Sequence, residues 1–546
     1  MDSRPEKRQR QSHEVGDTQP CFSSCWNDAV AWVRSNGGTV HPALTFSSAD
    51  RSVQIKSEEE DQSGKVIIPA GTVLMRIPSS CLLTVDAVSS TSYGKKLVDV
   101  IQSLLSSSSD NSLHNDASDL ILALYMAHMA SSANDSTSEY AAYLATLPHS
   151  SSYDNIPRRW DDKQLESLLG GTSLLIHVRK ERAGLKSDYA IIATAWAKSS
   201  KGGDTPSPEF PSFDKFDDMF AAVSSRGFAG LGSNGGQADA MVPLLDLLDH
   251  RRGTDAKKDV RYKRSCDTDD KGNGNATNAY VEVVADRDLS PGSTIHDTYG
   301  AKGNAQLLSR YGFCIPNNLE PDGSSNDVVE LSLKKGCPVV ELRAGPKSYT
   351  YGKFARMVEM FQEADGNEEA KNTNGQEEVS GMDDMEAFLN QCDEEEGGDD
   401  GDGCDGDDFD MMYGGMNGED DEDEGDEEKM LESEYKALEQ LSEALANARE
   451  RYSLKDKEIH NALEKTDGSP RHFAAILVQS ERRTMRLYEL ASIKILHRLK
   501  SMMTGSSLAE ESEKGDQDNE DDELLLKAQI DELVSAYATI RHGGLM

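Results

Sequence analysis

Apolar residues recur at helical spacing in several separate stretches of the chain. In CWNDAVAWVRSNGG, residues Trp26, Ala29 and Val33 fall on one face, and the glycine pair after Asn36 is typical of a helix C-terminus. The same amphipathic spacing predicts further helices. One begins near Pro157 and ends at 169, and another follows Ser212, which can cap it. The others are 115–130, 431–451, 472–502 and 523–540.

Short runs of β-type residues lie between these helices. Residues 66–68 and 72–77 are separated by the turn sequence PAG and predict a hairpin. Two further runs, 280–285 and 294–297, lie among many turn residues. Because strands and irregular loops come first and helices follow, the pattern predicts an α+β fold followed by an all-α unit.

The negative charge of the chain is concentrated in one segment. The 546 residues include 97 Asp+Glu against 57 Lys+Arg, a formal net charge of −40, and 23 of the acidic residues fall between Asp383 and Glu428. Such a block repels itself and buries too little apolar area to offset the entropy of ordering. We therefore expect a disordered acidic insert over about 362–430 and a smaller acidic loop over 510–523. The insert is either a tether for a basic partner or a solubilising insertion.

Composition narrows the class of protein. No run of 18 apolar residues occurs, so we expect no membrane span, and the polar N-terminus lacks the apolar stretch of a secretory signal. The strong negative charge disfavours direct binding of nucleic acid. Eight scattered cysteines without a CxxC pair predict neither a disulfide framework nor a metal site.

The first residues form a short basic tail. Residues 1–21 are polar, include the run KRQR at 7–10, and are expected to be disordered. Such a run is a weak nuclear signal. We expect a cytoplasmic or nuclear location, and a plastid location is not excluded by the sequence.

Three stretches between 241 and 316 carry the motifs that point to a family. They are MVPLLDLLDH (241–250), VVADRDLSPGSTIHDTYG (283–300) and GNAQLLSRYGF (303–313). Together they resemble the C-terminal half of a SET domain, in the branch of the Rubisco large-subunit methyltransferases and the actin-histidine methyltransferase. The stretches WVRSNGG, GTVLMRIPSSCLLT, YAAYLATLP, WDDKQLESLLGGT and SSRGF fit the same branch in the same order, and RERYSLKDKEIHNAL and RRTMRLYELASIKIL resemble its helical substrate-binding domain.

The resemblance implies both an architecture and a reaction. It implies a SET-domain β-fold over 22–316 with a helical insert over about 95–235, followed by a helical substrate-binding-like domain over 325–546. The implied reaction is methyl transfer from S-adenosylmethionine to a side-chain nitrogen of a protein, with lysine as the expected target and a monomer as the expected state. The lack of a GxGxxG motif after a strand disfavours a Rossmann-type methyltransferase.

The chemistry of this reaction needs few groups. The methyl of a sulfonium is already activated, so the protein has to supply alignment and acceptors for the polarised methyl rather than a metal. A free lysine has a pKa of about 10.4. A dry channel that disfavours the ammonium therefore assists directly.

The resemblance also assigns candidate site residues. Tyr299 in HDTYG matches the catalytic tyrosine of the family, and Tyr311 in SRYGF matches the second aromatic residue of its lysine channel. The motifs that hold the cofactor in the family, or lie next to it, match Arg226, Asp246, Asp249, His250 and Asn304. We expect a mainly structural role for Asn304.

One of these residues departs from the family. Asp249 stands where the family has asparagine, and its carboxylate either pairs with the ammonium of the cofactor or repels its carboxylate. Three functions therefore stay open: lysine methylation, histidine methylation, and a non-catalytic SET-like adaptor that binds basic partners through the acidic insert. Tyr311 favours lysine, because the histidine-modifying member lacks a tyrosine there.

Overall fold

The chain forms two compact units. In the computed structural model the first unit comprises Met1–Tyr153 and Glu181–Gly300, and the second comprises Asp154–Lys180 and Ala301–Met546. The structure describes residues 22–47, 52–57, 68–106, 113–131, 139–200, 209–232, 239–251, 258–268, 276–320, 324–331, 339–344, 354–362, 424–504 and 520–542. The predicted basic tail, residues 363–423 of the predicted acidic insert, and residues 510–519 of the smaller acidic loop lie outside these ranges.

The two units are interleaved along the chain. Residues 154–180 and 301–316, which the resemblance placed with the SET domain, cluster with the C-terminal helices. Packing explains the difference, because Trp160, Leu168 and Leu308 are buried in the same hydrophobic core as residues of α14 (Pro470–Thr504).

An antiparallel sheet with the strand order β1-β4-β9-β8 lies in the first unit. β4 (Val73–Pro78) was predicted, but its predicted hairpin partner is wrong. β4 pairs with β1 (Thr39–Val40) along one edge and with β9 (Ala276–Ala285) along the other. Ile68, from the predicted partner strand, forms an isolated bridge with Leu289 instead. β8 (Val260–Thr268) completes the sheet along β9.

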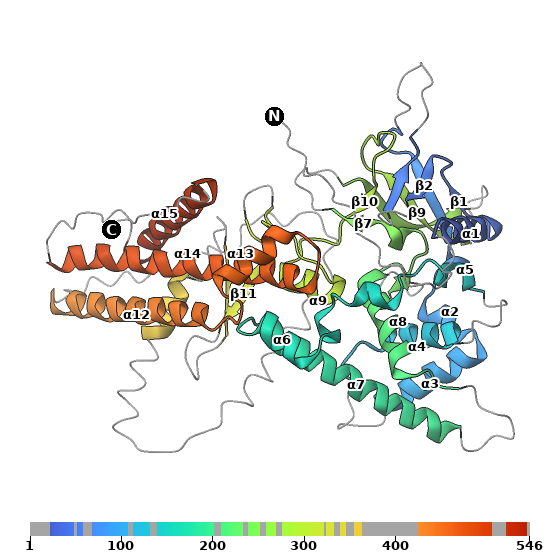
Figure 1. Cartoon of the computed structure of the whole chain (residues 1–546), viewed down its shortest axis with the longest axis horizontal. Coiled ribbons are helices and arrows are strands. Elements are labelled where there is room, and N and C mark those ends of the chain that lie inside the picture. The colour runs from blue at the N-terminus through green and yellow to red at the C-terminus, as the bar shows by residue number, and fades with distance from the viewer. Residues whose placement is uncertain are drawn as a thin grey trace. The chain divides into compact units, whose positions relative to one another are not determined.

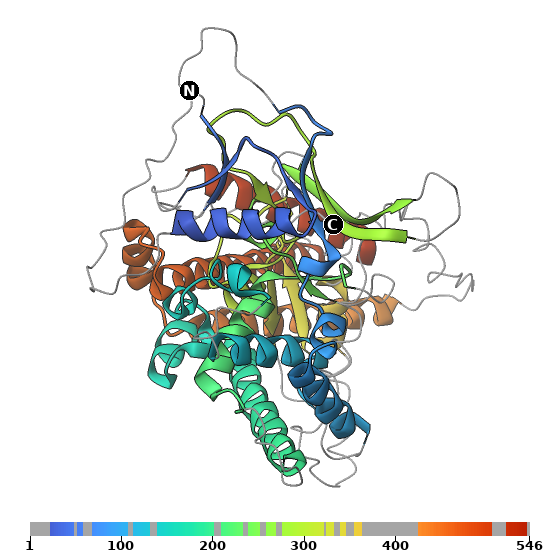
Figure 2. The same ribbon diagram turned by 90° about the vertical axis from the view of Figure 1, so that its right-hand side faces the viewer.

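The remaining strands of this unit pair in twos. Trp26 of α1 (Phe22–Ser35) stacks on Phe46 with ring centroids 6.0 Å apart, and Figure 2 shows α1 lying across the strands. The pairs are β2 (Leu44–Ser47) with β3 (Ser52–Ile55), β5 (Gly227–Phe228) with β6 (Ala240–Met241), and β7 (Asp249–His250) with β10 (His296–Asp297).

Helices make up the rest of the first unit (Figure 1). α4 (Ala117–Ser131) matches the predicted position but not the predicted amphipathic pattern, because every residue from Leu120 to Ala127 is buried among α2, α3 and α8. α8 (Phe213–Arg226) begins as predicted, with the Ser212 hydroxyl accepting from the N–H of Lys215. The other helices are α2 (Val85–Ser89), α3 (Ser92–Ser106), α5 (Ala141–Leu144), the part of α7 (Leu174–Ser199) from Glu181 onward, and the 3₁₀ turns Ser79–Cys81, Ser150–Tyr153 and Leu245–Leu247.

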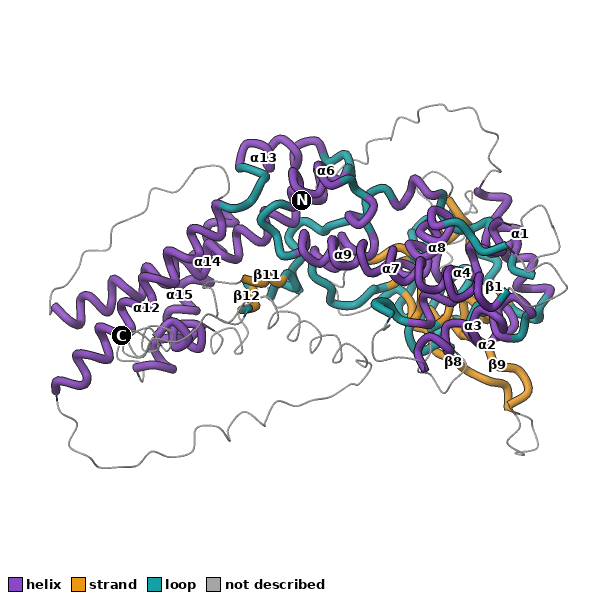
Figure 3. Tube along the Cα trace, turned by 90° about the horizontal axis from the view of Figure 1, so that it is seen from below, coloured by secondary structure: helices purple, strands orange, loops and turns teal. Residues whose placement is uncertain are grey.

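The second unit is built on long helices. α14 packs along α12 (Glu424–Glu450), and Figure 3 shows the two side by side. The helix predicted from Pro157 begins later, as α6 (Asp162–Leu169), because Pro157–Arg159 forms a 3₁₀ turn and the Asp161 carboxylate caps the helix. The other elements are α9 (Asn304–Tyr311), α13 (Asp456–Lys465), α15 (Glu520–His542), β11 (Val328–Leu331), β12 (Val340–Arg343) and a helical segment at 354–362.

No helix within the described ranges is both long enough and apolar enough to cross a membrane.

Candidate active site

Two short parallel strands in the first unit bring the central motifs together. In the β7–β10 pair, Asp249 lies opposite His296 and His250 lies opposite Asp297. The N–H of Arg251 extends the ladder by donating to the carbonyl of Asp297 at 2.8 Å. The motif LLDLLDH is thereby held next to the chain that leads into Tyr299.

The chain enters β7 through an unusual turn. Leu244 is fully buried and has φ of 70° and ψ of −37°, a region that a branched side chain rarely adopts. A 3₁₀ turn over Leu245–Leu247 follows. Backbone strain of this kind persists only where the surrounding packing fixes it, and it clusters at functional sites. After the turn, Asp246 is buried and Asp249 is exposed.

Tyr299 lies against His250. Their ring centroids are 4.9 Å apart with an interplanar angle of 27°, and the backbone N–H of Tyr299 donates to Nδ1 of His250 at 3.0 Å. Because Nδ1 accepts this hydrogen bond, a neutral imidazole carries its proton on Nε2, which is then a donor. The hydroxyl of Tyr299 donates to the carbonyl of Leu248 at 3.1 Å, so its oxygen can still accept. The structure therefore brings together two of the candidate site residues, Tyr299 and His250.

A buried polar cluster adjoins this pair. Arg226, the last residue of α8, donates to the carbonyl of Asp246, and the hydroxyl of Tyr143 donates to the Asp246 carboxylate at 3.1 Å. Burial raises the pKa of Asp246 to about 6, although Arg226 and Tyr143 oppose the shift. Burial alone would lower the pKa of Arg226, but nearby Tyr153, Asp246 and Tyr299 outweigh it and raise that pKa. Arg226 therefore remains a cation beside Tyr299.

Tyr143 is a residue of this cluster that sequence reasoning missed. It is fully buried in α5 and lies 103 positions from its partner Asp246. It falls within the stretch YAAYLATLP that contributes to the resemblance, which was the available signal for it.

The cluster has unused hydrogen-bonding capacity. Oδ1 of Asp246 and Nε of Arg226 are buried and find no hydrogen-bond partner among the residues that the structure describes. A buried polar atom left without a partner costs free energy unless a ligand or water satisfies it. The chemistry of the cluster and its neighbours fits S-adenosylmethionine. The carboxylates of Asp246 and Asp249 suit its ammonium, the guanidinium of Arg226 suits its carboxylate, and the Nε2 donor of His250 suits a base nitrogen.

Two predicted site residues belong to the second unit. Tyr311 is the last residue of α9, partly buried, with its ring 6.1 Å from that of Phe313. Asn304 is fully buried, and its amide nitrogen donates to the carbonyl of Ile315 at 3.0 Å and to Asp327 at 2.8 Å. Both amide hydrogens of Asn304 are therefore engaged within the protein.

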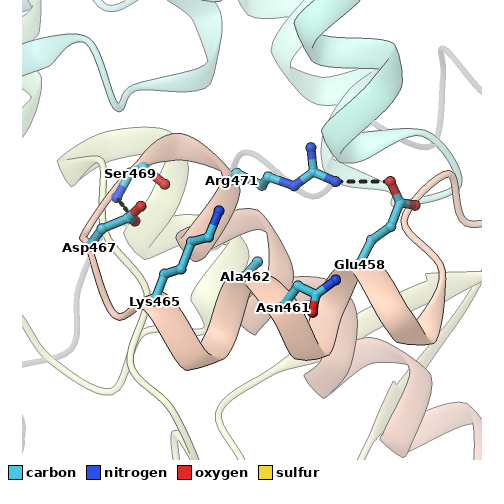
Figure 4. Close-up of a pocket in the computed structure, with 7 residues that line it drawn as sticks. All are labelled: Glu458, Asn461, Ala462, Lys465, Asp467, Ser469 and Arg471. Carbon is cyan, nitrogen blue, oxygen red and sulfur yellow. Dashed lines mark hydrogen bonds and ion pairs between the residues drawn. The ribbon is translucent and has the colours of Figure 1, made fainter.

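A separate hollow of about 220 Å³ lies where α13 meets the start of α14 (Figure 4). The guanidinium of Arg471 forms an ion pair with Glu458 at 2.9 Å on one side, and the N–H of Ser469 donates to Asp467 on the other. These polar groups bond with each other, and the hollow contains no residue of the predicted site.

The chain is similar to known proteins in sequence and in fold. No family model matches the sequence. The chain is similar to N-lysine methyltransferase SETD6 of Mus musculus, at 25% identity over 304 residues, which cover 54% of this chain and 56% of that protein. It is also similar to the setd6 protein of Danio rerio, at 24% identity over 237 residues, covering 41% and 47% of the two chains. The chain thus spans about half the length of these relatives.

The solved structures extend over most of the molecule. The SET domain of LSMT bound to lysine and AdoHcy aligns with a TM-score of 0.57 at 14% identity, covering 88% of this chain and 94% of that chain. Rubisco LSMT bound to AdoMet aligns with a TM-score of 0.54 at 14% identity, covering 88% and 93%. The predicted fold class is therefore confirmed: the chain has the α+β fold of SET-domain proteins, with a helical C-terminal region.

Proposed function

We propose that this protein is an S-adenosylmethionine-dependent methyltransferase that modifies lysine side chains of another protein. The observation that carries the proposal is the contact between Tyr299 and His250 beside the Arg226–Asp246 cluster, within a SET fold. The relatives named N-lysine methyltransferase support lysine as the target. We further propose that 22–316 acts as the SET domain and that a monomer uses 325–546 to contact the protein substrate, in the cytoplasm or the nucleus.

The cofactor, when bound, supplies a methyl group on a sulfonium. In the proposed site Arg226 binds a carboxylate through its guanidinium, a charge-assisted bond that a partly buried setting strengthens. The Asp249 carboxylate, exposed at the end of β7, binds an ammonium. His250 donates from Nε2 while Nδ1 stays bonded to the backbone of Tyr299.

Tyr299 aligns the reacting groups in this proposal. Its hydroxyl hydrogen is bound to the carbonyl of Leu248, so the oxygen presents lone pairs to the polarised methyl or to the incoming amine. The lysine has to lose its proton before transfer, which burial of the ammonium favours by lowering its pKa. We propose Tyr311 as a wall of the lysine channel, where an aromatic face attracts a methylated amine.

Two other functions are distinguished by specific residues. Histidine methylation is the alternative for the same fold, and Tyr311 argues against it. Asp249 in place of asparagine favours a non-catalytic adaptor if its carboxylate repels the cofactor. Calorimetry separates the adaptor from an enzyme, because an adaptor gives no heat of binding at high S-adenosylmethionine concentration.

The direct test is transfer of a tritiated methyl group from S-adenosylmethionine into fractionated host proteins. We expect label in a protein fraction, and mass spectrometry of the labelled peptides should place the methyl on lysine. Label on histidine would support the first alternative. No label with any fraction, together with no heat of cofactor binding, would reject the enzyme.

A further inference from the structure

Asp259 is a buried carboxylate next to the site that the proposed chemistry does not use. Its side chain is 2% exposed. Its Oδ2 accepts from the backbone N–H of His296 at 3.0 Å and lies 3.2 Å from Nδ1 of that ring. Its Oδ1 meets the guanidinium of Arg287 and lies 3.8 Å from Nη1 of Arg251.

These contacts keep Asp259 charged. Burial by itself would raise the pKa of Asp259, but the hydrogen bonds from His296 and the charge of Arg287 outweigh it, and the pKa is lowered. Oδ1 faces the arginine cations and Oδ2 accepts from His296, and removing the arginine partner would leave an uncompensated buried charge.

The partners of Asp259 lie on β10 and directly after β7, the two strands of the candidate site. His296 belongs to β10 and pairs with Asp249, whereas Arg251 directly follows His250 of β7. Asp259 itself is anchored in the larger sheet, because its carbonyl accepts from the N–H of Asp286 at 2.9 Å, just before β8 pairs with β9. Asp259 thus ties the larger sheet, through its backbone, to the two-residue strands β7 and β10, through its side chain.

We propose that Asp259 is a positioning residue that holds β7 and β10 in register, so that Nδ1 of His250 stays bonded to the backbone of Tyr299. A two-residue parallel pair has few ladder bonds of its own, and a slip of the register would separate the imidazole from the N–H it accepts. The catalytic consequence rests on the proposed function. The effect on His250 does not, and it is measurable without activity.

Asp259→Asn is the test variant, because it keeps the size of the side chain and one oxygen for the N–H of His296 but removes the charge that faces Arg287 and Arg251. A misplacement of about 1 Å in an active site can cost about 10²-fold in rate, so we expect kcat to fall by 10-fold to 10²-fold. The KM for the protein substrate should change little. Asp286→Asn is the matched control: it also removes a carboxylate from this hairpin, where Asp286 is 30% exposed and lies 3.7 Å from Arg261, and it should change kcat by less than about twofold.

The ring nitrogens of His250 give a readout that a general loss of stability would not move. In the wild type, ¹⁵N NMR should show an unprotonated Nδ1 and a protonated Nε2. In folded Asp259→Asn the two tautomers should mix, while Asp286→Asn should match the wild type. If Asp259→Asn does not fold, Arg287→Met weakens the same contact and should shift the His250 signals in the same direction.

The outcomes separate the two claims. A shifted His250 spectrum with lowered kcat supports the positioning role, and an unchanged His250 spectrum in the folded variant overturns it. A wild-type protein that transfers no methyl group, with a His250 spectrum that still responds to Asp259→Asn, supports the positioning role and rejects the proposed function.

Discussion

Two buried carboxylates near the candidate site, Asp259 and Asp246, differ from the buried Glu481 of the second unit. In the first unit, Asp259 contacts the guanidinium of Arg287, and Asp246 accepts from the hydroxyl of Tyr143 beside Arg226. In the second unit, Glu481 in α14 is fully buried and accepts from the hydroxyl of Tyr452 at 2.7 Å. Burial raises the pKa of Glu481 to about 8, and nearby Asp327 adds to the shift.

This difference in surroundings distinguishes carboxylates that serve the candidate site from a carboxyl that serves the helical core. Carboxylates that have cations nearby stay ionised at neutral pH and can hold a charged ligand or orient the groups that do. A carboxyl that is protonated at neutral pH acts as a neutral polar group in a helical core. The comparison predicts that changes around Tyr299 alter activity more than stability, whereas changes around Glu481 alter stability more than activity.

The largest effect is expected from Tyr299→Phe. Removing one oriented polar group from an active site typically costs about 10²-fold or more in rate, so methyl transfer should fall by that amount. The ring still stacks on His250, so cofactor binding should change little. Tyr189→Phe is the matched control, because it loses a similar bond from a tyrosine hydroxyl to a carbonyl, that of Pro211 at 2.8 Å. Equal turnover of Tyr299→Phe and the wild type would remove Tyr299 from the mechanism.

Much of the fold was predictable because local patterns determine it. α8 begins after Ser212 and α12 buries one leucine stripe, and both follow from spacing along the chain. β8 was missed because its sequence, VRYKRSCDT, is largely polar, and its place comes from its long pairing with β9. The wrong hairpin at 66–77 has the same cause, since the true partners of β4 are distant in sequence.

The candidate site was predictable only where its residues lie in motifs. His250 and Tyr299 each stand in a short recognisable sequence, and their contact spans 49 positions. Asp259 stands in no such motif, and Tyr143 stands in the stretch YAAYLATLP, which did not single it out. Both residues join the site through contacts that span 37 and 103 positions. Contacts of this kind depend on the tertiary fold, which residue spacing does not reveal.

A smaller effect is expected from Asp249→Asn. A hydrogen bond to a charged group is worth about 1.5–3 kcal/mol and a neutral one about 0.5–1.5 kcal/mol, so affinity for S-adenosylmethionine should fall by about tenfold. Calorimetry measures this, with Asp28→Asn, an exposed carboxylate on α1, as the control. Tighter binding by Asp249→Asn would show that the carboxylate repels the cofactor.

Glu481→Gln tests the other side of the comparison. Between pH 4.5 and about 8 the folded protein holds a proton on Glu481 that the unfolded chain has released, so the free energy of unfolding contributed by this group falls as pH rises. The glutamine side chain of the variant does not titrate. The difference in Tm, variant minus wild type, should therefore be larger at about pH 8.5 than at about pH 5. Glu439→Gln, at an exposed carboxyl on α12, is the matched control. A pH-independent difference in Tm would contradict the assignment.

The smallest effect is expected from deleting residues 366–420, which leaves about a tenth of the segment 363–423 as a linker. Arg541 forms an ion pair with Glu359 at 2.9 Å and donates to Gln362 at 3.0 Å, and it lies 3.8 Å from Glu434 of α12. These contacts link the helical segment at 354–362 to Glu434, which lies ten residues after the start of α12. Closing a tenfold shorter loop gains at most about 2 kcal/mol, so chemical denaturation should show equal or slightly higher stability. A large loss would mean that the acidic segment contributes to the folded core.

The central claim is that Tyr299, His250 and Arg226 surround one site for S-adenosylmethionine. Ultraviolet crosslinking of tritiated S-adenosylmethionine, followed by peptide mapping, tests it without requiring a protein substrate. We predict label on peptides that contain residues 241–251 or 294–300, and loss of that label in excess unlabelled S-adenosylmethionine. Label confined to other peptides, or none that the unlabelled cofactor displaces, would contradict the account.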